Sequence, residues 1–522
     1  MLGGLVTLLG RLPLHPLLLA AYAVLFLYSV NVDEVLPVDA AIPLATSVVG
    51  AVAVTAALAI LFRDLRRAAL VATVAVVTFY GFGHLAPTLA GVGLDDRAQL
   101  VLWGSLVVGT VLFALRAQES LPRATAGLNV IGVLLVVVAS ATIVPYEIQR
   151  AGRTPIAPVG TVEAAGDVAR RPDIYLLVFD RYGSADAIDR RFGLETDLPD
   201  WLESQGFTVA AGSHANYRAT DFSLAATLNM QFLDNLTAKI GPESGDRTPA
   251  YEMIQDHAVG RFLKNQGYRY YQLGSWFGPT KSVRIADENI VLGVTSEFET
   301  VLRDTTIVPA VERLLGTAAE TVPVEERTIP QRHRDGTIFA LRQLARISTA
   351  PGPKFVFAHI LLPHDPYVFR ADGSPISEEE ARHTQERELY AGHLAFANAQ
   401  IREIVGYLLL GPEAERPIVI IEGDEGPLAC RRVDCVTNTP EYLRIRLGNL
   451  IAMYLPELEA DLPDSFTSVN TFRLVFREYF GADLPPLPDR SFTWPDNNHI
   501  YAFRDVTELI REPKATRSEP PS

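Results

Sequence analysis

Cysteine is scarce in this sequence, and lysine is missing from a long part of it. Only two cysteines occur in 522 residues, Cys430 and Cys435, and neither lies in a Cys-x-x-Cys pair with partner histidines, so a zinc site is not indicated. The first 150 residues contain no lysine. The net charge is −15, which argues against binding to bulk nucleic acid, because such binding needs a basic face.

The first 150 residues carry long apolar segments. Each of these segments approaches the roughly 20 residues needed to cross a bilayer. A cleaved signal peptide would account for the first segment only. The segments lie near residues 14–31, 42–62, 68–90, 99–115 and 127–145. We therefore predict a transmembrane domain of five helices over residues 1–147.

The charges between these segments differ on the two sides of the predicted membrane domain. One side carries Arg11, Arg63, Arg66, Arg67, Arg116 and Arg123, and the other carries Asp33, Glu34, Asp39, Asp95 and Asp96 with a single Arg97. The positive-inside rule puts the arginine-rich side in the cytoplasm. The chain beyond about Tyr146 is then expected outside the cytoplasmic (inner) membrane of a multi-pass protein.

The predicted location outside the cytoplasm bears on the two cysteines, and the predicted membrane domain bears on His84. In an oxidising compartment Cys430 and Cys435 are expected to form a disulfide, with two free thiols as the alternative. His84, at the outer end of the third segment, faces a lipid substrate or is an interfacial residue with a polar partner.

The rest of the chain has the pattern of an α/β domain. Residues 148–171 are rich in Arg, Gly, Pro and Ala without apolar periodicity, which predicts a linker. From residue 172 to about 510, short apolar runs alternate with helical patterns, which predicts a mostly parallel sheet. The expected strands are 174–179, 208–212, 268–273, 354–362, 417–421, 450–454 and 500–503, and the clearest helices are 329–347 and 378–410. Residues 511–522 are polar and Pro-rich, and are expected to form a disordered tail.

Polar residues follow three of the apolar runs. Asp180 comes after the first run, His364 and Asp365 come after 354–362, and Asp424 and Glu425 come after 417–421. Ligands bind beyond the carboxyl ends of strands in open α/β sheets, and two carboxylates placed there can hold a hard cation. Each of these, taken singly, can also be an ordinary strand that ends in a polar turn.

A loop entering a helix is predicted over residues 216–230, with Thr220 or Asp221 as its N-cap. A hydroxyl in this position faces free N–H groups that attract phosphate. A divalent cation bound to that hydroxyl would lower its pKa and make it a nucleophile. The alternative is a plain capping threonine. His359 lies inside an apolar run and is interpreted as a core histidine.

Together these motifs resemble the alkaline phosphatase superfamily, in particular its membrane-anchored branch of lipoteichoic acid synthases and phosphoethanolamine transferases. The resemblance covers the whole architecture and implies an alkaline-phosphatase-like extracytoplasmic domain. It implies Asp180 as the acid that ends the first strand and Thr220 as the nucleophile. His364 of His364-Asp365-Pro366-Tyr367 matches the histidine that touches substrate.

The chain departs from the family pattern at the metal motif. Where the family has Ser-Asp-His-Gly, this sequence has Gly423-Asp424-Glu425-Gly426. The implied ligands are Asp180, Thr220, Asp424 and Glu425. This all-oxygen set suits one divalent cation, Mn²⁺ or Mg²⁺ with Ca²⁺ as a further option, better than Zn²⁺. Alternatively the site is degenerate and binds no metal.

The resemblance says less about the substrate than about the metal site. The histidine that holds glycerol phosphate in the synthases is not evident, and Trp276, Lys281, Arg284 and Asp365 are candidate substrate contacts instead. No Cys/Ser-x-Pro-x-Arg motif is present, so sulfate ester hydrolysis is disfavoured.

The resulting hypothesis is a metal-dependent phosphotransferase or phosphodiesterase at the outer face of the membrane. It would form a phospho-threonine intermediate at Thr220, with a membrane phospholipid as donor and an envelope glycan or water as acceptor. The alternative is a catalytically impaired domain that binds envelope glycan or a partner protein. A transporter is disfavoured, because the apolar segments carry no paired intramembrane charges.

Overall fold

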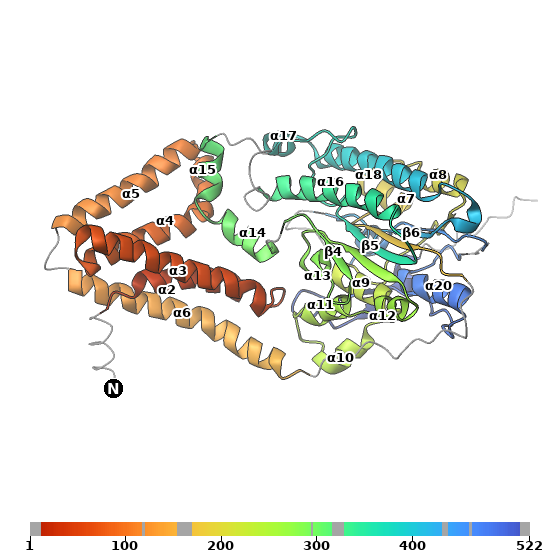
Figure 1. Ribbon diagram of the computed structural model, residues 1–522, viewed down its shortest axis with the longest axis horizontal. Helices are drawn as coiled ribbons and strands as arrows, with labels where there is room; N and C mark the ends of the chain where they lie inside the picture. Colours follow the sequence, from red (N-terminus) through yellow and green to blue (C-terminus); the bar gives the residue numbers. More distant parts are fainter. Residues whose placement is uncertain are drawn as a thin grey trace, which may run out of the picture. The chain divides into compact units, whose positions relative to one another are not determined.

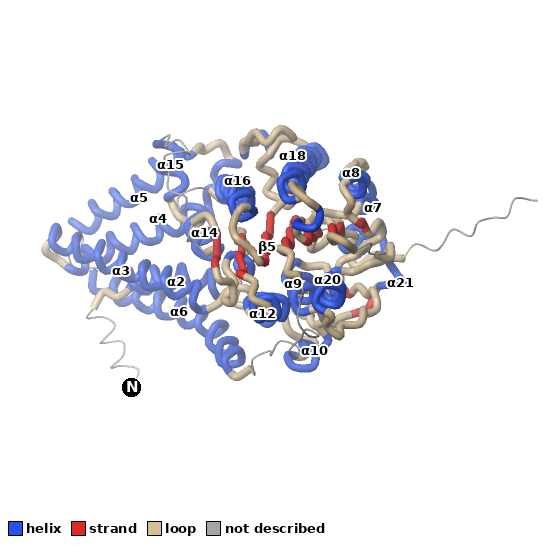
Figure 2. Tube along the Cα trace, turned by 45° about the vertical axis from the view of Figure 1, so that its right-hand side comes forward, coloured by secondary structure: helices blue, strands red, loops and turns tan. Residues whose placement is uncertain are grey.

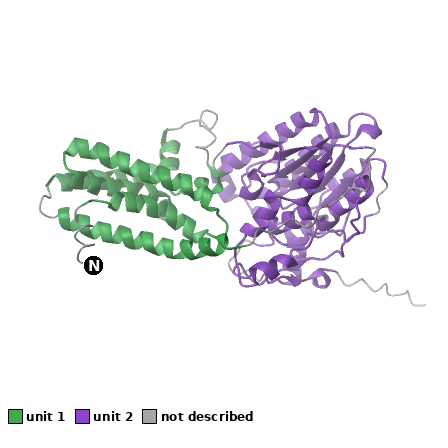
Figure 3. Cartoon of the chain, turned by 60° about the horizontal axis from the view of Figure 1, so that its bottom comes forward, with its two compact units in different colours: residues 1–155, 294–329 green, residues 156–293, 330–522 purple. Residues whose placement is uncertain are grey.

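The computed structural model describes residues 12–116, 121–153, 170–293, 296–315, 328–430, 437–458 and 462–511 (Figure 1). The chain divides into two units (Figure 3). Unit 1 is Met1–Pro155 with Val294–Ile329, and unit 2 is Ile156–Gly293 with Pro330–Ser522. The segment Val294–Ile329, which the sequence boundaries assign to the 172–510 domain, therefore groups with the N-terminal helices. The tail 511–522 lies, apart from Arg511, outside the described residues.

Unit 1 contains apolar helices at the five expected positions. They are α2 (His15–Val30), α3 (Pro37–Phe62), α4 (Leu65–Gly91), α5 (Asp96–Arg116) and α6 (Leu121–Ala151). By length and composition, α3, α4, α5 and α6 can each cross a membrane, whereas α2 has only 16 residues. Exposed leucine, isoleucine and valine side chains cover much of their surface, which suits a lipid environment.

Two further helices of unit 1, α14 (Glu297–Asp304) and α15 (Val308–Leu315), pack on α3 and α5. The connection between them also binds the backbone of α4. The Gly83 N–H donates to the Thr305 carbonyl at 2.9 Å, and the Ile307 N–H donates to the Phe79 carbonyl at 2.9 Å. In a regular α-helix that Gly83 N–H and that Phe79 carbonyl would pair with each other. His84, the next residue along α4, is exposed.

Unit 2 is built on a seven-stranded sheet in the order β2-β7-β6-β1-β5-β3-β4. Its strands are β1 (Ile174–Phe179), β2 (Thr208–Val209), β3 (Arg269–Leu273), β4 (Glu288–Ile290), β5 (Lys354–Ile360), β6 (Ile418–Glu422) and β7 (Ile451–Tyr454). The central β6, β1, β5, β3 and β4 run parallel, and β7 pairs antiparallel with β6 and with β2. The sheet is thus mostly parallel, as expected from the continuous apolar runs.

Helices cover both faces of this sheet (Figure 2). On one face the core contains Leu176, Phe357 and Ile420, and on the other it contains Leu177, Ala358 and Ile421. The helices of unit 2 are α7 (Ala185–Phe192), α8 (Leu198–Ser204), α9 (Thr220–Asn229), α10 (Asp234–Ile240), α11 (Thr248–Gln255), α12 (Ala258–Asn265), α13 (Gly278–Lys281), α16 (Ile329–Ser348), α17 (Glu378–His383), α18 (Glu386–Leu408), α19 (Pro440–Leu447), α20 (Thr471–Phe480) and α21 (Thr507–Ile510). In Figure 2, α7, α8, α16 and α18 lie above the strands, and α9, α12 and α20 lie below them.

Two sequence-based element assignments were wrong. Residues 500–503 form no strand, and the nearby strands are instead β8 (Phe492–Thr493) and β9 (Arg504–Asp505), which pair in a separate two-stranded sheet. The long helix expected over 378–410 is two helices, α17 and α18. The capping Ser377, whose side chain accepts from the Glu380 N–H, starts the first of them, and α17 ends before Thr384. Apolar composition alone could not show that residues 500–503 form no strand, or that the segment 378–410 is divided into α17 and α18.

Candidate active site

The turn after β1 joins two strand tips. The Asp180 N–H donates to the Ile360 carbonyl at 2.9 Å, which extends the pairing of β1 with β5. Arg181 then adopts a left-handed backbone with φ of 60°. Its N–H donates to Asp424 Oδ1 at 2.9 Å, so the turn after β1 holds the turn after β6.

The turn after β6 is closely packed from every side. A Cβ on Gly423 would lie 2.1 Å from the Tyr182 carbonyl oxygen, so only glycine permits this approach. Asn449 Nδ2 donates to the Gly423 carbonyl at 2.6 Å, and Ser223 Oγ donates to the Asp424 carbonyl at 2.5 Å. These contacts fix the Asp424 carboxyl against the start of α9.

Three buried side chains at these strand ends form a candidate metal site, which we call the ligand cluster: Asp180, His359 and Asp424. Each offers one ligand atom, and these atoms lie within 4.8 Å of one another. Asp180 Oδ1, His359 Nε2 and Asp424 Oδ2 are buried and have no hydrogen-bond partner among the described residues. Buried polar atoms are normally paired, so three unpaired atoms facing one another fit a bound cation.

The contact of His359 with Thr280 orients its ring for binding a cation. Its Nδ1 lies 2.8 Å from Thr280 Oγ1, whose hydroxyl points to the Phe277 carbonyl at 3.4 Å. An Nδ1–H donated to Thr280 leaves the Nε2 lone pair free, as is usual for metal-bound histidine. The sequence interpretation missed this residue. His359 lies within β5 opposite Val178 of β1, and that register brings it beside Asp180, with 3.4 Å between His359 Nε2 and Asp180 Oδ2.

The pKa values of the two aspartates of the ligand cluster shift in opposite directions. Burial alone would raise the pKa of Asp180, but the nearby His364 and His359 lower it below its usual range. Burial raises the pKa of Asp424 well above its usual range, and the negative charges of Asp180 and Glu425 add to this rise. The raised pKa of Asp424 thus reflects the neighbouring negative charges as well as burial. A divalent cation would remove the repulsion between the two carboxylates.

Thr220 lies at the start of α9 beside this cluster. It is the first residue of the helix, and its side chain is a hydrogen-bond partner of the Asp424 carboxyl. The expected N-cap assignment was wrong, because the N-cap is Ala219 and Thr220 and Asp221 are the first two helical residues. Asp221 instead pairs with Arg247 at 2.9 Å. Thr220 is thus free of a capping role.

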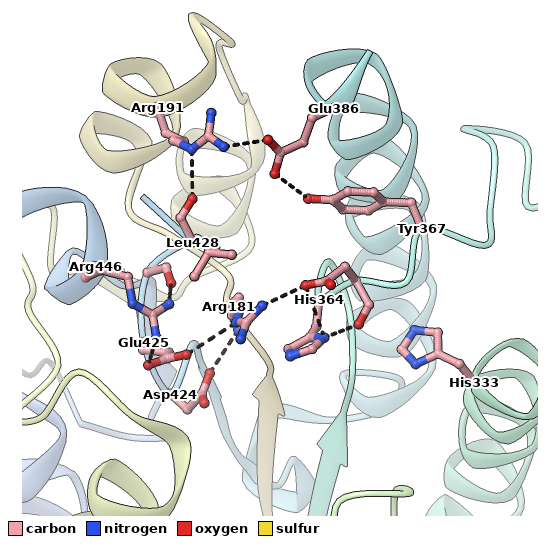
Figure 4. Close-up of polar contacts among 12 residues, drawn as sticks. Arg181, Arg191, His333, His364, Tyr367, Glu386, Asp424, Glu425, Leu428 and Arg446 are labelled. Atoms are coloured by element: carbon pink, nitrogen blue, oxygen red, sulfur yellow. Dashed lines mark hydrogen bonds and ion pairs between the residues drawn. The ribbon is translucent and has the colours of Figure 1, made fainter. Parts of the chain in front are cut away.

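Glu425 faces arginines. Its Oε1 lies 3.4 Å from Arg181 Nε, and its Oε2 lies 2.5 Å from Arg446 Nη2 (Figure 4). Arg446, from α19, also donates to the Gly426 and Arg218 carbonyls at 3.0 Å each. The side chain expected to complete the oxygen ligand set is therefore engaged by two guanidinium groups.

His364 lies on the other side of Arg181 (Figure 4). Its Nδ1 bonds the Asp365 carbonyl, so Nε2 is the ring nitrogen available to substrate. Burial lowers the pKa of His364, while Asp180 and Asp365 oppose that shift. The ring of Trp276 packs edge-on against it at 6.0 Å between centroids, and Trp276 Nε1 donates to His333 Nδ1 at 2.9 Å. Trp276 therefore lies beside the candidate acid–base residue.

The remaining residues that the sequence predicted for the site or for a disulfide have the following positions and partners. Asp365 accepts from Arg181 Nη1 at 2.7 Å. Arg284 is exposed and pairs with Glu252 at 2.6 Å, and Lys281 ends α13. Cys430 is disulfide-bonded, whereas Cys435 lies outside the described residues.

Several solved structures are similar to this chain at low sequence identity. No protein-family model matches the sequence, and no curated protein matches it. The C-terminal periplasmic domain of EptC from Escherichia coli is similar in structure, with 12% identity, a TM-score of 0.40, and coverage of 66% of this chain and 96% of that one.

Two further solved structures show the same level of likeness. An alkaline phosphatase superfamily protein from Vibrio parahaemolyticus has 11% identity, a TM-score of 0.40, and coverage of 67% and 80%. The phosphonate monoester hydrolase of Agrobacterium radiobacter has 12% identity, a TM-score of 0.39, and coverage of 61% and 75%. Similarity at this level says nothing about activity.

Proposed function

We propose that this chain is a membrane-bound, metal-dependent phosphotransferase or phosphodiesterase that acts through a phospho-threonine intermediate. The observation that carries the proposal is the contact between the Thr220 side chain and Asp424, a member of the ligand cluster. A hydroxyl at the start of a helix, beside buried atoms that await a cation, is the arrangement in which an alkoxide can form and meet a phosphate.

The residues present suit one divalent cation. Asp180, His359 and Asp424 would hold it, with Thr220 adjacent. When bound, the cation supplies positive charge that stabilises the threonine alkoxide and the phosphoryl oxygens. One imidazole and two carboxylates are a set that Mn²⁺ accepts. We therefore retain Mn²⁺ or Mg²⁺ as the proposed cofactor.

The first step transfers the phosphoryl group to the protein. Thr220 Oγ forms a bond to phosphorus as the bond between phosphorus and the leaving alcohol oxygen breaks. The hydroxyl proton passes to the carboxyl of Asp424, its hydrogen-bond partner. The leaving oxygen takes a proton from Nε2 of charged His364; burial lowers the pKa of His364 and disfavours this charged form, which Asp180 and Asp365 stabilise.

The second step reverses these roles. A glycan hydroxyl or water attacks phosphorus and gives its proton to His364 Nε2, while the bond from Thr220 Oγ to phosphorus breaks. Thr220 recovers its proton from Asp424. His364 stays aimed at the phosphoryl site because its Nδ1 is bound to the Asp365 carbonyl, which leaves Nε2 as the exchanging atom.

The apolar helices support a lipid substrate. α3, α4, α5 and α6 can each cross a bilayer, and the arginines near the α3–α4 and α5–α6 connections support a location of unit 2 outside the cytoplasm by the positive-inside rule. A phospholipid headgroup at the outer surface would then supply the phosphoryl group.

The nucleophile is tested with full-length protein in detergent and Mn²⁺, assayed on phosphatidylglycerol, phosphatidylethanolamine and a chromogenic phosphodiester. Thr220→Ala should abolish turnover and the acid-stable phosphate label on the protein. Thr220→Ser should retain part of both. Thr471→Ala, which removes a buried threonine hydroxyl outside the cluster, is the control. Unchanged turnover in Thr220→Ala would exclude the phospho-threonine mechanism.

One observation favours a second function. Glu425 stands where the family motif has a histidine, and both of its oxygens face arginines. A domain that had lost its metal could still bind envelope glycan or a partner protein. Stoichiometric Mn²⁺ in purified protein, measured by mass spectrometry of the metal, supports the enzyme, and its absence after soaking supports the binding domain.

A further inference from the structure

Arg181 has an unusual position for an arginine. It directly follows Asp180 of the ligand cluster and adopts a left-handed backbone, which costs a non-glycine residue roughly 1 kcal/mol or more. That conformation lets its N–H reach Asp424 at 2.9 Å. It also places the guanidinium group between Asp424 and Glu425 on one side and His364 on the other (Figure 4).

The guanidinium group is held in one orientation by two carboxylates from two other strand tips. Nε lies 3.4 Å from Glu425 Oε1, after β6, and Nη1 donates to Asp365 Oδ1 at 2.7 Å, after β5. Nη2 has no hydrogen-bond partner among the described residues. A partly buried guanidinium that is held by two carboxylates and keeps an open N–H edge is suited to a phosphate oxygen.

The charge balance around Glu425 supports the same conclusion. Its single negative charge is shared between Arg181 and Arg446, which approaches its other oxygen at 2.5 Å. Asp365 also pairs with Arg181, so the two guanidinium groups and these two carboxylates balance in charge. Neither carboxylate contacts Nη2, which leaves that nitrogen as the donor for a non-bridging phosphoryl oxygen.

We infer that Arg181 is a catalytic residue that donates from Nη2 to a non-bridging phosphoryl oxygen, and that Glu425 is a positioning residue that aims Arg181. This inference rests on the proposed function for the identity of the substrate group. Glu425, which stands where the family motif has a histidine, then positions the Arg181 guanidinium group and does not bind the metal. The site then holds phosphate between one divalent cation and one fixed guanidinium.

The test measures metal and phosphate binding separately, on full-length protein in detergent. Mn²⁺ content is measured by mass spectrometry, and inorganic phosphate is titrated calorimetrically into the Mn²⁺-loaded protein. Arg181→Gln should keep stoichiometric Mn²⁺ and weaken phosphate binding by about 10-fold or more, as expected for losing a charged hydrogen bond. Arg181→Lys, which keeps the charge without the planar fork, should be intermediate.

Glu425→Gln separates positioning from metal ligation. It should keep Mn²⁺ and weaken phosphate binding, whereas Asp424→Asn should lose Mn²⁺. In the enzyme assay both Arg181→Gln and Glu425→Gln should lower kcat, Arg181→Gln by about 100-fold or more, as for loss of an oxyanion donor. Arg402→Gln, which removes the charge of an arginine paired with Asp197 at 2.7 Å, should leave phosphate affinity unchanged.

Three results would overturn the inference. Loss of Mn²⁺ in Glu425→Gln would make that residue a ligand. Phosphate binding at wild-type affinity in Arg181→Gln would remove Arg181 from the substrate site. An equal loss of phosphate affinity in Arg402→Gln would show a general charge effect. Failure of the proposed function is a separate outcome, which would show as wild-type protein that takes up no Mn²⁺. The phosphate titration of the metal-free Arg181 variants would then still decide the role of the guanidinium group.

Discussion

At the residue scale, opposite charges gather at the ends of β1, β5 and β6. The charged side chains that meet there are Asp180, Asp365, Asp424, Glu425, Arg181 and Arg446. The carboxylates outnumber the guanidinium groups by a margin that one divalent cation would neutralise. In the absence of a cation, the raised pKa of Asp424 allows a proton to take its place.

The ligand role of His359 leads to a direct prediction. His359→Gln should lower Mn²⁺ affinity by at least about 10-fold, a loss seen even when outer-shell partners of a metal are changed. His499→Gln is a matched control, because His499 is an exposed histidine that also pairs with an aspartate, Asp496, at 2.7 Å. Calorimetric Mn²⁺ titration of both variants decides the matter, and equal affinity in the two would remove His359 from the site.

Glu422 makes stability depend on pH. Burial raises its pKa to about 8, against smaller opposite effects of hydrogen bonds with Thr471 and Ser468. The unfolded chain loses this proton near pH 4.3, so between about pH 4.3 and 8 the folded state binds the extra proton and stability falls as pH rises, by at most about 1.4 kcal/mol per unit.

Glu422→Gln should remove that slope. The variant is expected to melt close to wild type at pH 5 and at a higher temperature than wild type at pH 8, both measured in EDTA. Glu415→Gln, at an exposed glutamate of the 3₁₀ turn η2 (Glu413–Glu415), is the control and should show no such divergence. A Glu422→Gln advantage of the same size at both pH values would contradict a neutral buried carboxyl.

At the scale of elements, α4 and the connection between α14 and α15 form a tight backbone contact within unit 1. A Cβ on Gly83 would lie 2.4 Å from the Asp304 carbonyl oxygen and 2.7 Å from Thr305 Cα. Backbone atoms cannot move aside as a flexible side chain can. The contact therefore depends on the absence of a side chain at Gly83.

Gly81 provides the matched comparison two residues earlier on the same helix, because a Cβ there would have no atom within 4 Å. Gly83→Ala should destabilise detergent-solubilised protein by about 1–3 kcal/mol, as overpacking does. Gly81→Ala should be neutral or slightly stabilising, since alanine favours helix. Thermal melting of both variants, with hydrogen exchange at Thr305–Ile307 as the local readout, tests this, and equal melting of the two would show that the contact contributes little.

At the scale of the whole molecule, the chain passes between its two units at residues 155/156, 293/294 and 329/330. The proposed topology puts unit 2 outside the cytoplasmic membrane. The chain thus returns once from unit 2 to the segment that packs on α3 and α5, and then enters unit 2 a second time. Unit 1 therefore contains sequence from both sides of the linker.

Cysteine labelling tests the topology. In right-side-out spheroplasts, Thr349→Cys, an exposed position after α16, should react with a membrane-impermeant maleimide. Arg116→Cys, exposed at the end of α5, should react only after permeabilisation. The native Cys430 is disulfide-bonded and contributes no background. Labelling of Arg116→Cys in intact spheroplasts would reverse the proposed orientation.

The sequence by itself determined the local features of this protein. Apolar runs and their flanking charges located the helices of unit 1, and continuous apolar runs ending in Asp180, His364 and Asp424 located the central strands and their tips. These features depend on neighbouring residues, because burial and periodicity act over a few positions. They were enough to predict a site at these strand ends that includes the two aspartates and Thr220.

Only the tertiary structure decided which groups complete the site. His359 joins the ligand cluster because the register of β5 against β1 sets it beside Asp180, and Glu425 faces arginines because α19 brings Arg446 to it. The grouping of Val294–Ile329 with the N-terminal helices likewise depends on contacts between residues more than 200 positions apart, such as the pair Arg313 and Asp96. Such pairings follow from strand register and packing, which no local pattern in the chain encodes.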